Sequence, residues 1–190
     1  FKKADTKSRK YFASFYYPLE GGYGAICDAF YREIAHKVNL NTEVLSILRD
    51  DGKVVGIETL RDGVRQLHAC DTVISTLPLT VTGKMLGLTI PLGYQKVDAV
   101  YLWINKPEAG PYHWVYFIDA DVSINRMVEF KHMSHYDCPK DTTVLCAEVT
   151  EDIPDPAEKV ISDLVRSGYI RKEDVLDTLV VREDTSYPIY

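Results

Sequence analysis

The sequence predicts an α+β fold in which helices pack against antiparallel sheets. Short stretches alternate apolar and polar residues and are separated by Pro, Gly and Asp, a pattern typical of antiparallel strands. Two longer stretches repeat their apolar residues every three or four positions, as helices do. A hydrophobic fraction of 46% with 26% charged residues is ordinary for a folded globular domain.

The first helix is expected over residues 22–37, after an aromatic, β-prone stretch over residues 11–17 that ends at Pro18. Apolar residues recur there at every fourth position: Ile26, Phe30 and Ile34. Asn39 suits the turn that ends this helix.

A hairpin sheet is expected next, with strands over residues 42–48, 53–60 and 64–69. Gly52 and Gly63 supply the positive φ that the two tight turns require. The apolar run over residues 72–77 then predicts a short strand buried on both faces, which Pro78 ends.

The second half predicts another antiparallel sheet with a helix packed on it. A short helix over residues 80–87 precedes strands at 97–104, 113–118, 124–130, 143–149 and 175–182. A longer helix over residues 155–167 has Asp155 as its cap, Pro156 in its first turn and Gly168 at its end.

Charge and cysteine usage exclude several classes of protein. A net charge of −6 disfavours nonspecific nucleic-acid binding, and the longest apolar run is too short to span a membrane. The cysteines form no C-x-x-C pair, so no metal site is expected. Unpaired cysteines without an export signal favour the cytoplasm. The chain starts at Phe1 with a basic segment, which we interpret as the inside of a longer protein.

Few features indicate chemistry by themselves. The Gly21-Gly22-x-Gly24 turn could present N–H groups to an anion, but no phosphate-binding fingerprint of the G-x-G-x-x-G type occurs. Arg126 in a predicted strand suits a phosphate or carboxylate, or an ion pair with Glu148 or Glu129. Aromatic residues at 112–117 and 187–190 fit a pocket wall or core packing equally well.

The order of short motifs resembles the flavin amine oxidase superfamily, in particular its protoporphyrinogen oxidase-like and UDP-galactopyranose mutase-like members. The first half carries Phe15-x-Tyr17-Pro18-x-x-Gly21-Gly22-x-Gly24, Val38-Asn39-Leu40-Asn41-Thr42-x-Val44 and the run from Cys70 to Leu79. The second half, which is similar to the mutase-like branch, carries Trp114-x-Tyr116-Phe117, Asn125-Arg126-Met127-x-x-Phe130, Val144-Leu145-x-x-Glu148, and Val181-Arg182 before Tyr187-Pro188.

This resemblance implies FAD as cofactor and a Rossmann-like FAD-binding domain interleaved with an antiparallel substrate domain. Residues 1–37 would link the two sides, residues 38–78 would belong to the FAD side, and residues 79–190 to the substrate side. The implied cofactor-binding residues are Gly21, Gly22, Val44, Thr76, Leu77 and Pro78. The implied substrate-binding residues are Arg126, which matches a diphosphate-contacting arginine of the mutases, with Tyr116 and Tyr187 as pocket residues.

Three functions stay open at this point. The chain is expected to be an internal piece, inactive by itself, of an FAD-dependent oxidoreductase-type enzyme that acts on a small molecule such as a nucleotide-sugar. Oxidase or dehydrogenase chemistry of the amine oxidase and protoporphyrinogen oxidase type is the first alternative. A noncatalytic binding module derived from the substrate domain is the second.

Overall fold

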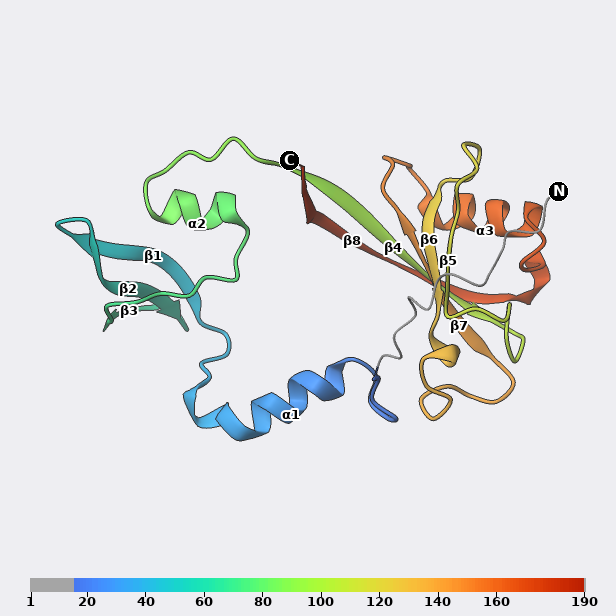
Figure 1. Cartoon of the computed structure of the whole chain (residues 1–190), viewed down its shortest axis with the longest axis horizontal. Helices are drawn as coiled ribbons and strands as arrows, with labels where there is room; N and C mark the ends of the chain where they lie inside the picture. The colour runs from blue at the N-terminus through green and yellow to red at the C-terminus, as the bar shows by residue number, and fades with distance from the viewer. Residues whose placement is uncertain (1–15, 190) are drawn as a thin grey trace, which may run out of the picture.

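The computed structural model describes residues 16–189 and contains two separate antiparallel sheets. One is three-stranded, in the order β1-β2-β3, and the other is five-stranded, in the order β5-β6-β7-β4-β8. Figure 1 shows them at opposite ends of the molecule. Most of the β-prone stretch predicted over residues 11–17, with Phe15, and the final Tyr190 lie outside the described residues.

The first helix, α1 (Gly24–Ile34), continues into a 3₁₀ turn, η2 (Ala35–Lys37), so the predicted helix is confirmed. None of the residues of α1 is buried. Its predicted apolar face therefore exists but is exposed, as Phe30 and Ile34 illustrate.

The three-stranded sheet agrees with the prediction almost residue for residue. Its strands are β1 (Glu43–Asp50), β2 (Lys53–Arg61) and β3 (Val64–Ala69). Both turns place an aspartate and a glycine at positive φ: Asp51 (45°) with Gly52 (75°), and Asp62 (50°) with Gly63 (77°). Two consecutive positive φ values match the right-handed twist of a hairpin, which explains the Asp-Gly pairs.

The buried strand predicted over residues 72–77 is wrong. The segment has no strand assignment, and Ile74 is 91% exposed. An apolar run becomes a doubly buried strand only between hydrogen-bonded neighbours and covered faces. Within residues 16–189 no strand pairs with this segment, and it instead leads into α2 (Leu79–Met85).

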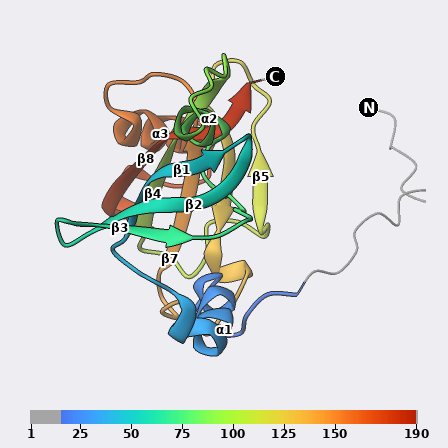
Figure 2. The ribbon, with the colours of Figure 1, turned by 90° about the vertical axis from the view of Figure 1, so that its left-hand side faces the viewer.

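Helix α2 confirms the short helix predicted after Pro78 and lies beside the three-stranded sheet. The guanidinium of Arg49 on β1 donates to the carbonyl of Leu86 at 2.6 Å, and the Ser75 and Thr82 hydroxyls are 2.7 Å apart. In Figures 1 and 2, α2 lies above this sheet and α1 below it.

The longest pairing of the five-stranded sheet joins β4 to the edge strand β8. Its strands are β4 (Gly93–Ile104), β5 (Trp114–Tyr116), β6 (Ile124–Glu129), β7 (Thr143–Val149) and β8 (Val175–Ile189). All five predicted strands are confirmed in position, but β5 is shorter and β8 longer than expected. Strand β8 extends because it follows β4 from Ile104 back to Gly93.

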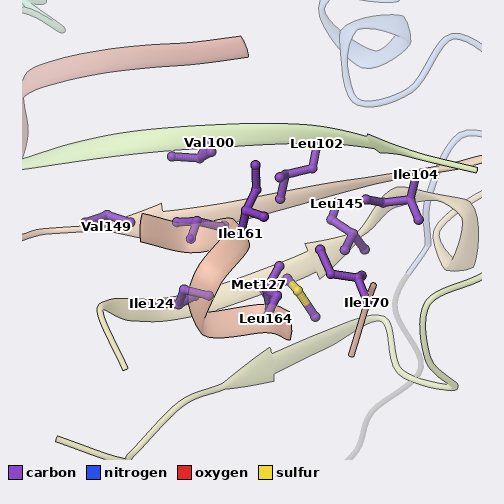
Figure 3. Packing of buried hydrophobic residues seen from close by; sticks show 12 residues of the cluster. Val100, Leu102, Ile104, Ile124, Met127, Leu145, Val149, Ile161, Leu164 and Ile170 are labelled. Atoms are coloured by element: carbon purple, nitrogen blue, oxygen red, sulfur yellow. The ribbon is translucent and has the colours of Figure 1, made fainter. Parts of the chain in front are cut away.

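Helix α3 (Pro156–Arg166) covers one face of this sheet and forms the main core with it. The Asp155 carboxylate accepts a hydrogen bond from the Glu158 N–H at 3.1 Å, and Gly168 has a φ of 76°, so both predicted ends are confirmed. Figure 3 shows the apolar side chains that meet between the sheet and α3, among them Val100, Leu102, Leu145, Met127 and Leu164. Among residues 16–189 no helix is both long and apolar enough to cross a membrane.

Candidate functional site

The face of the five-stranded sheet opposite α3 carries the candidate site, and we call it the open face. Because successive strand residues point to opposite sides, the neighbours of the core residues Val100, Met127 and Leu145 lie on it. Strand pairing aligns these residues in two cross-strand rows. The first row is Trp114, Val128, Cys146, Tyr101 and Leu179; the second is Tyr116, Arg126, Glu148, Ala99 and Val181.

Arg126 forms a bidentate ion pair with Glu148 in the second row. The Arg126 Nε donates to Glu148 Oε2 at 3.1 Å, and Nη2 donates to Oε1. The two side chains are 34% and 20% exposed. The hydrogen bond with Glu148 raises the pKa of Arg126 above its ordinary value, and a hydrogen bond with Tyr116 contributes in the same direction. Of the two ion-pair partners that the sequence left open, the structure selects Glu148.

A second polar contact lies in the first row, between Tyr101 and Cys146. The two residues are directly paired across β4 and β7. Burial raises the pKa of the Cys146 thiol to about 11 and also raises the pKa of Tyr101. The thiol is therefore protonated at neutral pH and is a poor nucleophile. The Tyr101 ring also stacks on Phe130, with ring centres 6.2 Å apart.

The expected substrate residues are only partly brought together. Tyr116 and Arg126 are directly paired across β5 and β6. Tyr187 lies outside the two rows, because it pairs with Gln95 near the start of β4. Glu148, Tyr101 and Cys146 were not among the expected site residues. The sequence offered Glu148 only as one of two possible ion-pair partners of Arg126, and it showed Tyr101 and Cys146 as ordinary strand residues. The strand register places all three in the row of Arg126 or next to it.

Most of the expected cofactor residues meet at a second place, beside the three-stranded sheet. Val44, Thr76 and Leu77 line one open cavity of about 480 Å³. Pro78 follows directly and begins α2, where its carbonyl accepts from the Val81 N–H at 2.9 Å. The rest of the wall is mainly apolar: Ile47, Val73, Ile74, Val81 and Met85. Such a surface fits one flat, apolar portion of a large cofactor.

Gly21 and Gly22 are engaged elsewhere. Both have positive φ, 79° and 59°, and their N–H groups donate to the two carboxylate oxygens of Asp137 at 2.9 Å each. Ser134, in the same loop between β6 and β7, donates to the Leu19 carbonyl. The N–H groups of this turn are thus directed at an anion in this structure, and that anion is a carboxylate of the same protein.

Comparison with known proteins gives one family and a set of similar structures. Residues 3–112 match the family model described as flavin containing amine oxidoreductase. No curated protein matches the sequence.

Three solved structures share the fold at low sequence identity. A reduced UDP-galactopyranose mutase matches with a TM-score of 0.72 at 20% identity, over 90% of this chain and 40% of that one. An oxidoreductase from Methanosarcina mazei matches with 0.63 at 20% identity, over 87% of this chain and 43% of that one. A triple mutant of a flavin-dependent brominase matches with 0.51 at 14% identity, over 84% and 43%. The chain thus spans less than half the length of each of these proteins.

Proposed function

This chain belongs to the family of flavin-containing amine oxidoreductases, and we propose that it forms the substrate side of an FAD-dependent oxidoreductase-type enzyme. The cofactor of this family is FAD. The observation that carries the proposal is the open face, where a mainly apolar and aromatic surface surrounds one arginine. Small-molecule sites are lined mainly by apolar and aromatic side chains, with a small number of polar groups that fix the orientation of the ligand.

The proposed FAD side contains the three-stranded sheet, and the proposed substrate side contains the five-stranded sheet. Residues 1–37 link the two sides, residues 38–78 belong to the FAD side as part of a Rossmann-like domain, and residues 79–190 carry the substrate side. Helix α2, within the last range, packs beside β1, so the chain passes to the substrate side a second time over the segment from Leu86 to Leu92.

The residues that would hold FAD are those of the cavity beside β1: Val44, Thr76, Leu77 and Pro78. Their mainly apolar surroundings suit a flat ring or an adenine portion. Gly21 and Gly22 are proposed as a further contact with FAD. This contact requires the Asp137 carboxylate to move away from their N–H groups. Bound FAD supplies the hydride acceptor of an oxidation.

On the substrate side, the chain orients the reactant and limits the access of water. Trp114 and Tyr116 offer exposed ring surface for a ring-bearing substrate. The Tyr116 and Tyr101 hydroxyls and the Arg126 guanidinium are the polar groups that can fix its direction. Tyr187, on the extended part of β8, is proposed to contact a more distant portion of the substrate.

A nucleotide-sugar mutase-like reaction is the second candidate. The observation in its favour is Arg126, whose guanidinium is the kind of group that binds a diphosphate. In this version Arg126 holds the diphosphate, and Arg126→Ala weakens nucleotide-sugar binding by about 1.5–3 kcal/mol, the usual contribution of a hydrogen bond to a charged group.

The test is the visible absorption spectrum of the protein expressed from its full parent gene, followed by titration with a UDP-sugar. Flavin bands support the proposed enzyme, and their absence would favour a noncatalytic binding module. Bands that respond to the UDP-sugar, with a response that Arg126→Ala weakens, select the mutase-like reaction. The exposed arginine of the hairpin sheet, in Arg61→Ala, is the matched control and should leave the titration unchanged.

A further inference from the structure

We propose that Glu148 keeps phosphate groups away from Arg126, so that the open face accepts an uncharged, ring-bearing, mainly apolar substrate. This inference rests on the proposed function, because it names the substrate class of the same site. Three observations on the open face support it: the geometry of the ion pair, the balance of charge, and the chemistry of the surrounding side chains.

The ion pair occupies the Nε/Nη2 edge of the guanidinium, one of the two edges at which a phosphate can accept two hydrogen bonds. Glu148 accepts from both Nε and Nη2 of Arg126, which is the two-point arrangement that carboxylates and phosphates share. A diphosphate at this edge would have to displace Glu148. Because Glu148 is only 20% exposed, its carboxylate would then lose its partner in a partly desolvated position.

Among residues 16–189, the two cross-strand rows contain no second positive charge that could hold a diphosphate. Within the two cross-strand rows, Arg126 and Glu148 are the charged residues, and they neutralise each other. The next position along β8 on the same face adds an acid, since Asp177 pairs with Trp103. A phosphate-bearing ligand would therefore meet a neutral to negative surface, where like charges repel.

The other side chains of the rows suit an apolar ring system. Tyr116 is 63% exposed, and Trp114, Leu179 and Val181 are each at least 41% exposed. Exposed apolar surface of this kind, with a few polar groups at its centre, marks a binding site. An uncharged substrate could cover it and leave the Arg126–Glu148 pair intact, with the Tyr116 hydroxyl available for orientation.

The experiment compares UDP and the uncharged dye Nile red as probes of the full-length, FAD-loaded protein. Calorimetric titration with UDP is expected to show weak binding to the wild type. Glu148→Gln, which frees Arg126, should tighten UDP binding roughly ten- to a hundredfold. Adding Arg126→Gln to that variant should abolish the gain. Nile red should bind the wild type, and Leu179→Asp should weaken it, whereas Leu40→Asp, at a similarly exposed leucine outside the sheet, should not.

Two results would overturn the inference. One is UDP binding that is already micromolar in the wild type. The other is Nile red binding that Leu179→Asp does not affect. The wild-type UDP titration decides even if a variant fails to fold. Flavin bands are read from the same samples, so a flavin-loaded protein that binds UDP tightly refutes only the substrate class. A protein without flavin refutes the proposed enzyme.

Discussion

Replacing Glu129 by glutamine is expected to release the connection between β4 and β5, which leads into the open face. The Glu129 side chain is only 3% exposed. Its carboxylate accepts from the Ala109 N–H at 2.9 Å, the Gly110 N–H at 3.2 Å and the Thr143 hydroxyl at 2.8 Å. It therefore fastens this loop to the end of β6, beside the strand that carries Trp114 and Tyr116.

The cost of the substitution follows from the donors that converge on the carboxylate. Glutamine keeps one acceptor oxygen and turns the other into an N–H₂ donor, which would face a donor of the loop or of Thr143. Losing a charge-assisted hydrogen bond and leaving a buried donor unpaired together cost about 2–4 kcal/mol. If this energy resists local opening, the Ala109 and Gly110 amides should exchange roughly 30- to 900-fold faster.

Hydrogen–deuterium exchange of the peptide covering residues 105–117 measures this effect in the full-length protein. Glu108→Gln, at an exposed acid of the same loop, is the matched control and should leave the exchange unchanged. Exchange in Glu129→Gln that stays within threefold of the wild type would refute the idea that the carboxylate holds the loop. Unfolding of the five-stranded sheet would accelerate exchange in all of its peptides, so protection that persists in β4 and β7 shows that the effect is local.

Three further predictions concern Asp137 and Cys146. Asp137→Ala should accelerate amide exchange at Gly21 and Gly22, since it removes the carboxylate that accepts both N–H groups; unchanged exchange there would contradict this contact. Cys146 should resist alkylation at pH 8, where exposed Cys27 reacts. Because burial raises the pKa of Cys146 from 9.0 to about 11, its proton stabilises the folded state fully below pH 9. Between pH 9 and 11 the free energy of unfolding should fall by roughly 2–3 kcal/mol, a loss that Cys146→Ala removes in a pH series of denaturant titrations.

The elements that the sequence predicts well are those fixed by local chemistry. The Asp-Gly turns at 51–52 and 62–63 require positive φ, and few residue types other than Gly, Asn and Asp adopt it. Helix α3 begins at a capping aspartate and ends at a glycine, so its bounds follow from single residues. The segment over residues 72–77 fails for the opposite reason. Its apolar run says nothing about whether neighbouring strands exist, because strand pairing is decided by distant parts of the chain.

The candidate site was likewise predicted only in part from the sequence. Motif order places Arg126 in a strand and Thr76 to Pro78 in one short segment, and the structure shows both. The partner of Arg126 depends on the register between β6 and β7, which joins residues that are far apart in sequence. Glu148 and Glu129 were equivalent by residue type. The alternation along β6 separates them, because Arg126 and Glu129 point to opposite faces of the sheet.

The packing of the core between the sheet and α3 therefore determines which side chains lie on the open face. Met127 and Leu145 are buried under α3, and a slip of one residue in β6 would expose Met127 and bury Arg126 beneath the helix. Burying an unpaired guanidinium costs far more free energy than the shifted register could gain. This alternative register is therefore excluded. The same hydrophobic contacts that stabilise the domain therefore hold Arg126 opposite Glu148 and Tyr116. A variant that loosens this core, such as Met127→Ala, should disturb ligand selection at the open face although Met127 never touches the ligand.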